Sequence, residues 1–367
     1  MKRSNSRKTN FVLKLAIFLF ALLISSGPSL ALAEEAYHSL EEKKKAGLGS
    51  AVAENITLGG LLEVEFTNED NERDGVGSDI TLATVEVAID AKINENVEGH
   101  ILFLWEEDGG PIALDEGTIT INSSYGLSLT AGKQYVPFGN FESHFVSDPQ
   151  TLELGETNQS AVLLGYEKGP VEIALGLFNG DLDGGNLALT DNDRVDNYVA
   201  SVKVAPVDGV SFGLSWISDL ADTDAEITEA WGASPTLGYL IDDSVAGISA
   251  FLSLAFGPVA FEAEYLGALD EFDVLDLDVD TDLKGDKPST YNVEVAYEVN
   301  DNIEVALRYE GNTDLFELPE TQYGVAASYE VFENTNFSVE YLQGEYDDTG
   351  NLEEKRTLIT AQIAVEF

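Results

Sequence analysis

The feature that most restricts the fold is the regular alternation of short and long connections between strand-like segments. From Asn55 to the end, strand signals recur sixteen times and no helical period interrupts them for long. The segments span residues 55–66, 80–93, 97–106, 117–122, 127–136, 160–167, 171–179, 195–205, 209–218, 246–256, 259–267, 289–299, 303–311, 321–331, 336–346 and 356–367. The connections alternate between turns of two to four residues and polar links of nine residues or more.

A transmembrane β-barrel with short turns on one side of the membrane and longer loops on the other has this pattern. A soluble sandwich would not place its short turns so regularly at alternate ends. We therefore predict an all-β protein, a transmembrane antiparallel up-and-down barrel of about sixteen strands over residues 55–367. An even number of strands places both chain ends on the same side.

The last strand-like segment shows the two faces of such a strand most clearly. Between Arg356 and Phe367, one side carries an almost continuous apolar row that ends on the aromatic Phe367. A strand that faces lipid needs such a row, with aromatic residues where the membrane meets water. A terminal phenylalanine on an alternating strand also resembles the recognition signal of bacterial outer-membrane proteins.

The N-terminus has the order of parts that is typical of a cleaved signal peptide, residues 1–33. Basic residues precede an apolar core from Leu15 to Ile24, and Ala31-Leu32-Ala33 precedes Glu34. A retained anchor is the alternative, but this core is shorter than the about 20 residues of a spanning helix. We interpret residues 34–54 as a short polar segment on the periplasmic side. Cleavage would change the formal net charge from −48 to −53, because five basic residues are removed, and a chain so acidic is a poor partner for nucleic acid.

Carboxylates dominate the rows of side chains that we expect to face inward. In a narrow, dry barrel so much like charge would require protonation or partners, so the acids predict a water-filled lumen. The acids either create a cation-favouring field along a channel or simply form a solvated polar face. The expected lumen residues are Glu63, Glu86, Glu98, His100, Glu262, Glu264, Glu294, Glu298, Glu304 and Arg308.

The link 137–159 mixes aromatic and polar residues, and a fully exposed loop would make its phenylalanines costly. We expect this third long loop to fold into the barrel mouth as a constriction; packing on the rim is the alternative. Its candidate solute contacts are Phe138, Asn140, Phe141, His144 and Phe145. Ser143 beside His144 raises a hydrolase alternative, although nothing in the sequence identifies an acid to orient the histidine.

Two acidic links are candidate sites for divalent cations, because hard cations take oxygen ligands. One contains Asp181, Asp183 and Asn186. The other contains Glu271, Asp273 and the alternating acids Asp276, Asp278, Asp280 and Asp282. Neither run completes a calcium-binding loop. The sequence has no phosphate-cradling glycine loop and no zinc-ligand cluster, so we predict no cofactor. We also expect no plug domain ahead of the barrel, which a TonB-dependent transporter of about 22 strands would need.

The run Gly132-Lys133-Gln134-Tyr135-Val136-Pro137-Phe138-Gly139-Asn140-Phe141 resembles a motif of the LbtU-type siderophore porin family. The likeness continues through Ser147-Asp148-Pro149-Gln150-Thr151 and Leu154-Gly155-Glu156-Thr157 and extends over the barrel, residues 55–367. It implies a sixteen-stranded outer-membrane porin for ferric siderophore uptake. The strongly acidic lumen departs from what an anionic ferric siderophore would need.

The leading hypothesis is therefore a passive outer-membrane porin for small solutes, with a ferric siderophore as the cargo that the resemblance implies. A general cation-favouring diffusion porin is the alternative within the same class. The alternatives from other classes are an outer-membrane hydrolase using Ser143 and His144, and a structural or adhesive barrel. The sequence leaves the oligomeric state open.

Overall fold

The structure is a computed structural model that describes residues 49–53, 55–73, 75–107, 109–180, 195–223, 244–273, 284–315, 318–346 and 354–367. The expected signal peptide and all but the end of segment 34–54 lie outside these residues. The strands are β1 Gly49–Ala53, β2 Ile56–Asn71, β3 Gly75–Lys92, β4 Val97–Trp105, β5 Ala113–Asn122, β6 Leu127–Tyr135, β7 Asn158–Lys168, β8 Val171–Asn179, β9 Val195–Val207, β10 Val210–Ile217, β11 Gly247–Phe256, β12 Val259–Ala268, β13 Ser289–Asn300, β14 Ile303–Thr313, β15 Thr321–Phe332, β16 Thr335–Glu345 and β17 Lys355–Glu366. A short helix, α3 Gln150–Gly155, lies between β6 and β7.

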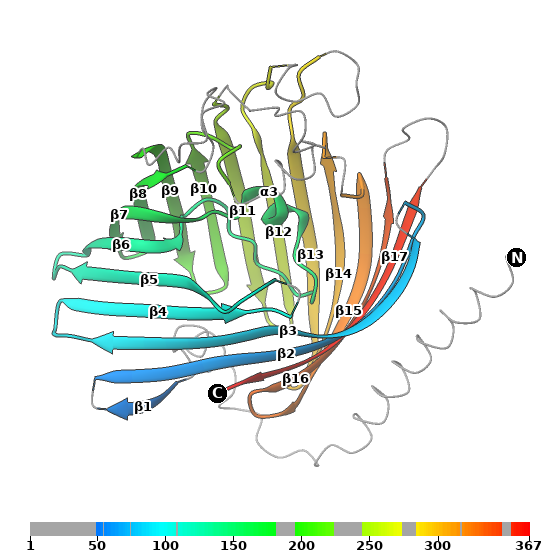
Figure 1. Cartoon of the computed structure of the whole chain (residues 1–367), viewed down its shortest axis with the longest axis horizontal. Coiled ribbons are helices and arrows are strands. Elements are labelled where there is room, and N and C mark those ends of the chain that lie inside the picture. Colours follow the sequence, from blue (N-terminus) through cyan, green and yellow to red (C-terminus); the bar gives the residue numbers. More distant parts are fainter. Residues whose placement is uncertain are drawn as a thin grey trace, which may run out of the picture.

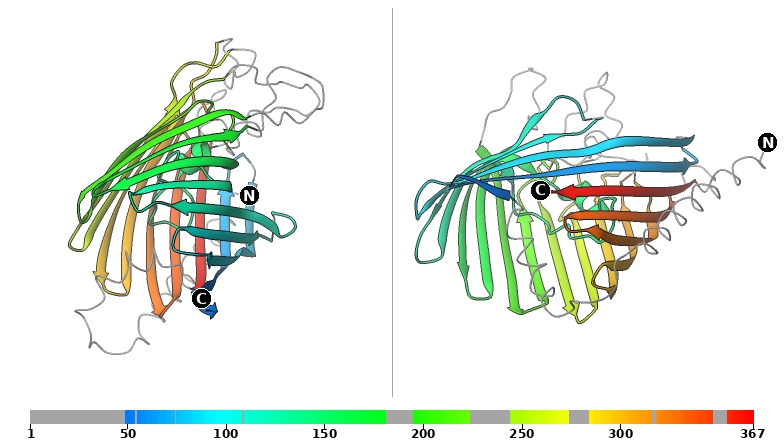
Figure 2. Two further views of the ribbon diagram at one scale, coloured as in Figure 1. Left: turned by 90° about the vertical axis from the view of Figure 1, so that its left-hand side faces the viewer. Right: turned by 90° about the horizontal axis from the view of Figure 1, so that it is seen from below.

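The strands β2 to β17 form one closed antiparallel barrel. Each pairs with the next in sequence, and β17 returns to pair with β2 over the stretch from Glu366↔Leu61 to Arg356↔Asn71. Figure 1 shows the sheet curving round until β17 lies beside β2, and Figure 2 shows it from two further sides. The prediction of an all-β barrel of sixteen strands is confirmed. No helix in the described part of the chain is long and apolar enough to cross a membrane.

The outer face of the barrel is apolar and exposed, as the alternation predicted. On β13, Val295 and Tyr297 are 42% and 48% exposed, and on the neighbouring β14 Leu307 reaches 62%. Between these positions lie the inward Ala296 and Arg308, which are buried. A surface of this kind is stable only against lipid, so the barrel spans a membrane.

The two ends of the barrel sequence meet at a seam that the C-terminal residue completes. The N–H of Phe367 donates to the Gly60 carbonyl at 3.0 Å, and the N–H of Gly60 donates to the Phe367 carbonyl at 2.9 Å. The aromatic ring of Phe367 lies over Gly60, where a Cβ atom would be 2.4 Å from its Cζ. Beyond this point β1 pairs with β2 from Gly49↔Gly59 to Ala53↔Ile56, a strand that the sequence analysis did not predict.

One predicted long link is wrong. Residues 67–79 were expected to form a loop, but β2 continues to Asn71 and β3 begins at Gly75, so a tight hairpin joins them. Apart from Val76, these residues are polar or glycine on both faces, as is expected where a hairpin extends beyond the membrane and neither face needs to be apolar. Polarity therefore did not distinguish a strand in water from a loop.

Candidate functional site

The loop between β6 and β7, residues 136–157, lies inside the barrel, and we call it the inward loop. Its ends are held by an apolar cluster at the mouth. Phe138 and Leu154 are each 1% exposed and pack among buried side chains of the barrel and of neighbouring links, including Phe178 and Leu266. Gly139 makes the turn after Phe138 with φ +86°, a conformation that side chains disfavour. The apolar contacts explain why the aromatic residues predicted for this loop are not on the surface.

The middle of the loop has little secondary structure, so its backbone N–H groups need other acceptors. Glu264 of β12 supplies two of them. The N–H of Asn140 donates to its Oε1 at 2.8 Å, and the N–H of Phe141 donates to its Oε2 at 2.9 Å. The Ser249 hydroxyl on β11 donates to the same carboxylate at 2.7 Å. One carboxylate thus fixes the beginning of the loop against the wall.

Glu294 of β13 holds the next part of the loop in the same way. Its Oε2 accepts the N–H of His144 at 2.7 Å, and its Oε1 accepts the Ser143 hydroxyl at 3.0 Å. The ring Nδ1 of His144 lies 2.9 Å from Glu304 Oε1 on β14. Burial lowers the pKa of His144, but the hydrogen bond and charge of Glu304, with the charges of Glu294 and Glu262, outweigh it and raise the pKa above 6.5.

Two further carboxylates continue this series. Glu340 of β16 accepts the N–H groups of Val146 at 2.8 Å and Ser147 at 3.0 Å, and the Ser147 hydroxyl also donates to it. Glu310 of β14 accepts the N–H of Gln150 at 2.9 Å, at the start of α3. Because each wall carboxylate accepts backbone N–H groups, we call the inner faces of β12, β13, β14 and β16 the anchored wall.

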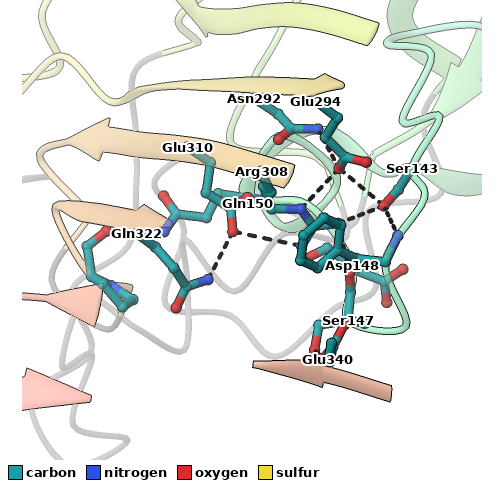
Figure 3. A network of polar contacts seen from close by, with 12 residues as sticks. Ser143, Ser147, Asp148, Gln150, Asn292, Glu294, Arg308, Glu310, Gln322 and Glu340 are labelled. Carbon is teal, nitrogen blue, oxygen red and sulfur yellow. Dashed lines mark hydrogen bonds and ion pairs between the residues drawn. The ribbon is translucent and has the colours of Figure 1, made fainter. Parts of the chain in front are cut away.

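Arg308 of β14 joins the loop to the anchored wall (Figure 3). Its Nε donates to Glu294 Oε1 at 2.8 Å, and its Nη1 lies 3.6 Å from Glu310 Oε1. The other donors of the guanidinium reach the loop backbone, at the carbonyls of Ser147 (2.9 Å) and Asp148 (3.3 Å). All three charged side chains at the centre of this network are fully buried.

Phe145 packs beneath the same guanidinium. The Arg308 Cζ lies 4.4 Å from the ring centroid of Phe145, which also contacts the cluster of Ala296, Ala306 and Ala326. A delocalised cation over an aromatic face is favourable, most strongly when both are desolvated. The network therefore combines ion pairs, hydrogen bonds and a cation–π contact on one arginine.

This geometry corrects part of the lumen assignment. Glu264, Glu294 and Arg308 were expected to line open water, but they are 8%, 0% and 2% exposed beneath the loop. Glu304 faces His144. The period-2 pattern placed all four on the inner face, but it could not show that a loop from elsewhere in the chain covers them. Glu262 and Glu298 stay on the inner face and are half-buried.

The opposite side of the lumen, the inner faces of β2 to β5, has a different character, and we call it the open wall. It carries the predicted Glu63 and Glu86 together with Glu65 and Glu116, all of them half-buried. From the inward loop, the exposed Asp148 comes within electrostatic range of Glu63 and Glu65. The space between the inward loop and the open wall is therefore flanked by carboxylates from both sides.

The sequence analysis did not single out Asp148, Glu116 or Glu340. For Glu116 and Glu340 the available signal was the alternation of side chains along the strand. Glu116 shares a face with the predicted His100, and Glu340 shares a face with Leu342. Glu98 and His100 lie nearer the other end of the open wall, in a pocket described below. The position of Asp148 on the loop had no comparable signal.

The hydrolase alternative is not supported by the site. The Ser143 hydroxyl bonds to Glu294 and accepts from Arg308, while the His144 ring faces Glu304. The nucleophile and base of a hydrolase must bond to each other. Within the described ranges no group of three or more acidic, histidine or cysteine side chains is arranged to hold a metal ion. The proposed cation ligands at 181–186 and 276–282 lie outside the described residues, whereas Glu271 and Asp273 of the second series lie within them.

Comparison with known proteins agrees with the fold. The family model described as Gram-negative porin matches residues 21–349. A UPF0422 protein of Coxiella burnetii is 26% identical over 326 residues, which are 83% of this chain and 67% of that protein. One of Legionella pneumophila is 33% identical over 124 residues, 30% of this chain and 23% of that protein. The outer membrane channel DcaP of Acinetobacter baumannii superposes with a TM-score of 0.60 at 13% identity, covering 87% of this chain and 99% of that one.

Proposed function

This chain belongs to the Gram-negative porin family and forms an outer-membrane channel for small solutes, and from that premise we propose that it favours cations. The observation that carries the proposal is the unequal use of the inward carboxylates. On the anchored wall, the loop occupies the carboxylates of Glu264, Glu294, Glu310 and Glu340. By contrast, Glu63, Glu65, Glu86 and Asp148 flank the remaining passage. Carboxylates along a narrow aqueous path attract cations and repel anions.

A planar-bilayer recording in a salt gradient tests this selectivity. We expect a reversal potential of the sign that cation preference gives. Replacing Glu63, Glu65 and Glu86 together by glutamine should move that potential towards zero, because the shape is kept and the charge is lost. The matched control is Glu333→Gln, in the exposed turn between β15 and β16, which should change nothing. Anion preference in the unaltered protein would refute the proposal.

For the cargo, we propose that the channel admits a ferric siderophore whose complex is neutral or cationic. The support is the resemblance of the run from Gly132 to Phe141 to the siderophore porin family, together with the acidity of the passage. Phe138 and Phe145 are engaged by the wall, Phe141 packs against the apolar cluster at the mouth, and the His144 ring faces Glu304. Among the predicted loop contacts we therefore expect Asn140 to meet such a chelate in the docked loop.

Deleting residues 141–156 tests the loop as the element that discriminates between solutes. Single-channel conductance should rise, because the constriction is removed. Discrimination between a ferric siderophore and a sugar of similar size should weaken in a liposome-swelling assay. A folded deletion variant with unchanged conductance would show that the loop does not limit the passage.

A further inference from the structure

A second polar site lies on the open wall near the end of the barrel that carries the short turns, which faces the periplasm. It is a cavity of about 370 Å³, lined among others by Thr57, Asp90, Lys92, Glu98, His100 and Thr120. That volume lies within the range of about 300–1,000 Å³ that is typical of small-molecule sites. We call it the periplasmic pocket.

The strand register gives the four ionisable side chains a fixed arrangement. Asp90 lies opposite His100 and Lys92 lies opposite Glu98 on the paired strands β3 and β4. Successive residues on one face of a strand are about 7 Å apart. The backbone positions of Lys92, which carries the one ammonium among these lining residues, and Asp90 are therefore about 7 Å apart, and Glu98 lies opposite Lys92 on the neighbouring strand.

The two cross-strand pairs, Asp90 with His100 and Lys92 with Glu98, differ in whether their side chains already bond to each other. His100 Nδ1 lies 2.7 Å from Asp90 Oδ1, so these groups satisfy each other. In the described part of the chain, neither Lys92 nor Glu98 makes an ion pair or a side-chain hydrogen bond, although they face each other. An ammonium and a carboxylate are thus both available to a solute, with hydroxyls and an imidazole beside them.

We propose that the periplasmic pocket binds a small zwitterion whose ammonium and carboxylate are several bonds apart, as in a dipeptide. The solute carboxylate pairs with Lys92. The solute ammonium pairs with Glu98 and with Oδ2 of Asp90, the carboxylate oxygen that does not face His100. A purely anionic solute meets two carboxylates there, and a purely cationic one leaves Lys92 without a partner. This inference goes beyond the proposed function, which concerns the passage at the loop, and it does not depend on the ion preference of the channel.

Binding can be measured without conductance, on the full chain folded in detergent. Glycylglycine is titrated while the imidazole NMR signals of the three histidines are followed, with the His100 signal assigned by its loss in His100→Gln. We expect a saturable shift of that signal. Lys92→Gln and Glu98→Gln should each weaken the Kd about tenfold, because each removes one charge-assisted contact. Lys168→Gln, an exposed lysine at the same end of the barrel but outside the pocket, is the matched control and should leave the Kd unchanged.

Two single-charge analogues test the charge pattern on the unaltered protein, whatever the variants do to folding. N-acetylglycine keeps only the carboxylate and glycinamide keeps only the ammonium, and both should bind more weakly than glycylglycine. No saturable shift, equal binding of either analogue, or an equal effect of Lys168→Gln would overturn the proposal. A protein that binds glycylglycine but shows no cation preference would refute the proposed selectivity and leave the pocket standing.

Discussion

Replacing Arg308 by methionine should release the inward loop from the anchored wall without unfolding the barrel. The change removes a fully buried guanidinium and leaves the carboxylates of Glu294 and Glu310 buried without their cation. Breaking a buried ion pair in this way costs about 3–5 kcal/mol. If that cost falls on docking of the loop, the undocked population rises by a factor of roughly a hundred to several thousand. The strand pairing of β14 does not involve the guanidinium, so the barrel should remain closed.

Single-channel conductance and cleavage of the loop by thermolysin report docking, and heat-modifiable electrophoretic mobility reports the folded barrel. Arg308→Met should raise both conductance and cleavage. Arg356→Met is the matched control, since Arg356 also pairs with a glutamate, Glu69 at 2.8 Å, but both side chains are partly exposed, at 24% and 35%. An exposed pair is worth about 0–1 kcal/mol, so this variant should behave like the unaltered protein. A folded Arg308→Met protein with normal conductance and a protected loop would refute the anchoring role.

Three further predictions concern the seam and the loop. Removing Phe367 should reduce the amount of barrel in the outer membrane more than it destabilises barrel that has folded, measured by membrane yield and by urea unfolding. The control is Phe332→Ala, an exposed aromatic at the end of β15, and normal yield without Phe367 would contradict an assembly role. Gly60→Ala should destabilise the barrel by about 1–3 kcal/mol in urea, because its Cβ would overlap the Phe367 ring, and unchanged stability would show that the ring moves freely. Because the pKa of His144 is raised, its pair with Glu304 stabilises the docked loop fully below pH 6.5 and is lost as pH rises through the raised value, so thermolysin cleavage should increase with pH in the unaltered protein and not in His144→Gln.

The barrel was predictable because each strand carries its own evidence. The segment predicted at 289–299 is β13, Ser289–Asn300, and the segment predicted at 303–311 is the core of β14, Ile303–Thr313. Their alternation exists because lipid and lumen impose opposite polarity on the two faces. Where lipid is absent, as beyond Phe66 on β2, the side chains need not alternate between polar and apolar. The predicted end of this strand, at residue 66, was therefore earlier than its actual end at Asn71.

The partners of the inward side chains were not predictable in the same way. Period 2 assigns Glu264 and Glu294 to the inner face, but it contains no information on what lies across the lumen. That information is a set of contacts between distant parts of the chain, such as Asn140 with Glu264, 124 residues apart. Water and a loop backbone satisfy a carboxylate equally well, so composition alone could not distinguish a channel lining from an anchor.

The inward loop is held by residues that lie C-terminal to it, and this order affects when the loop can dock during folding. The wall groups that hold the loop come after it in sequence, from Ser215, 76 residues downstream of Gly139, to Glu340, 194 residues downstream of Val146. Contacts that close such long stretches of chain form late, because the entropy of closure must be overcome first. The strands that carry Glu294, Arg308 and Glu340 must therefore be in register before the loop can settle. Until then the loop does not fill the lumen, so we expect the newly closed barrel to conduct more than the finished one.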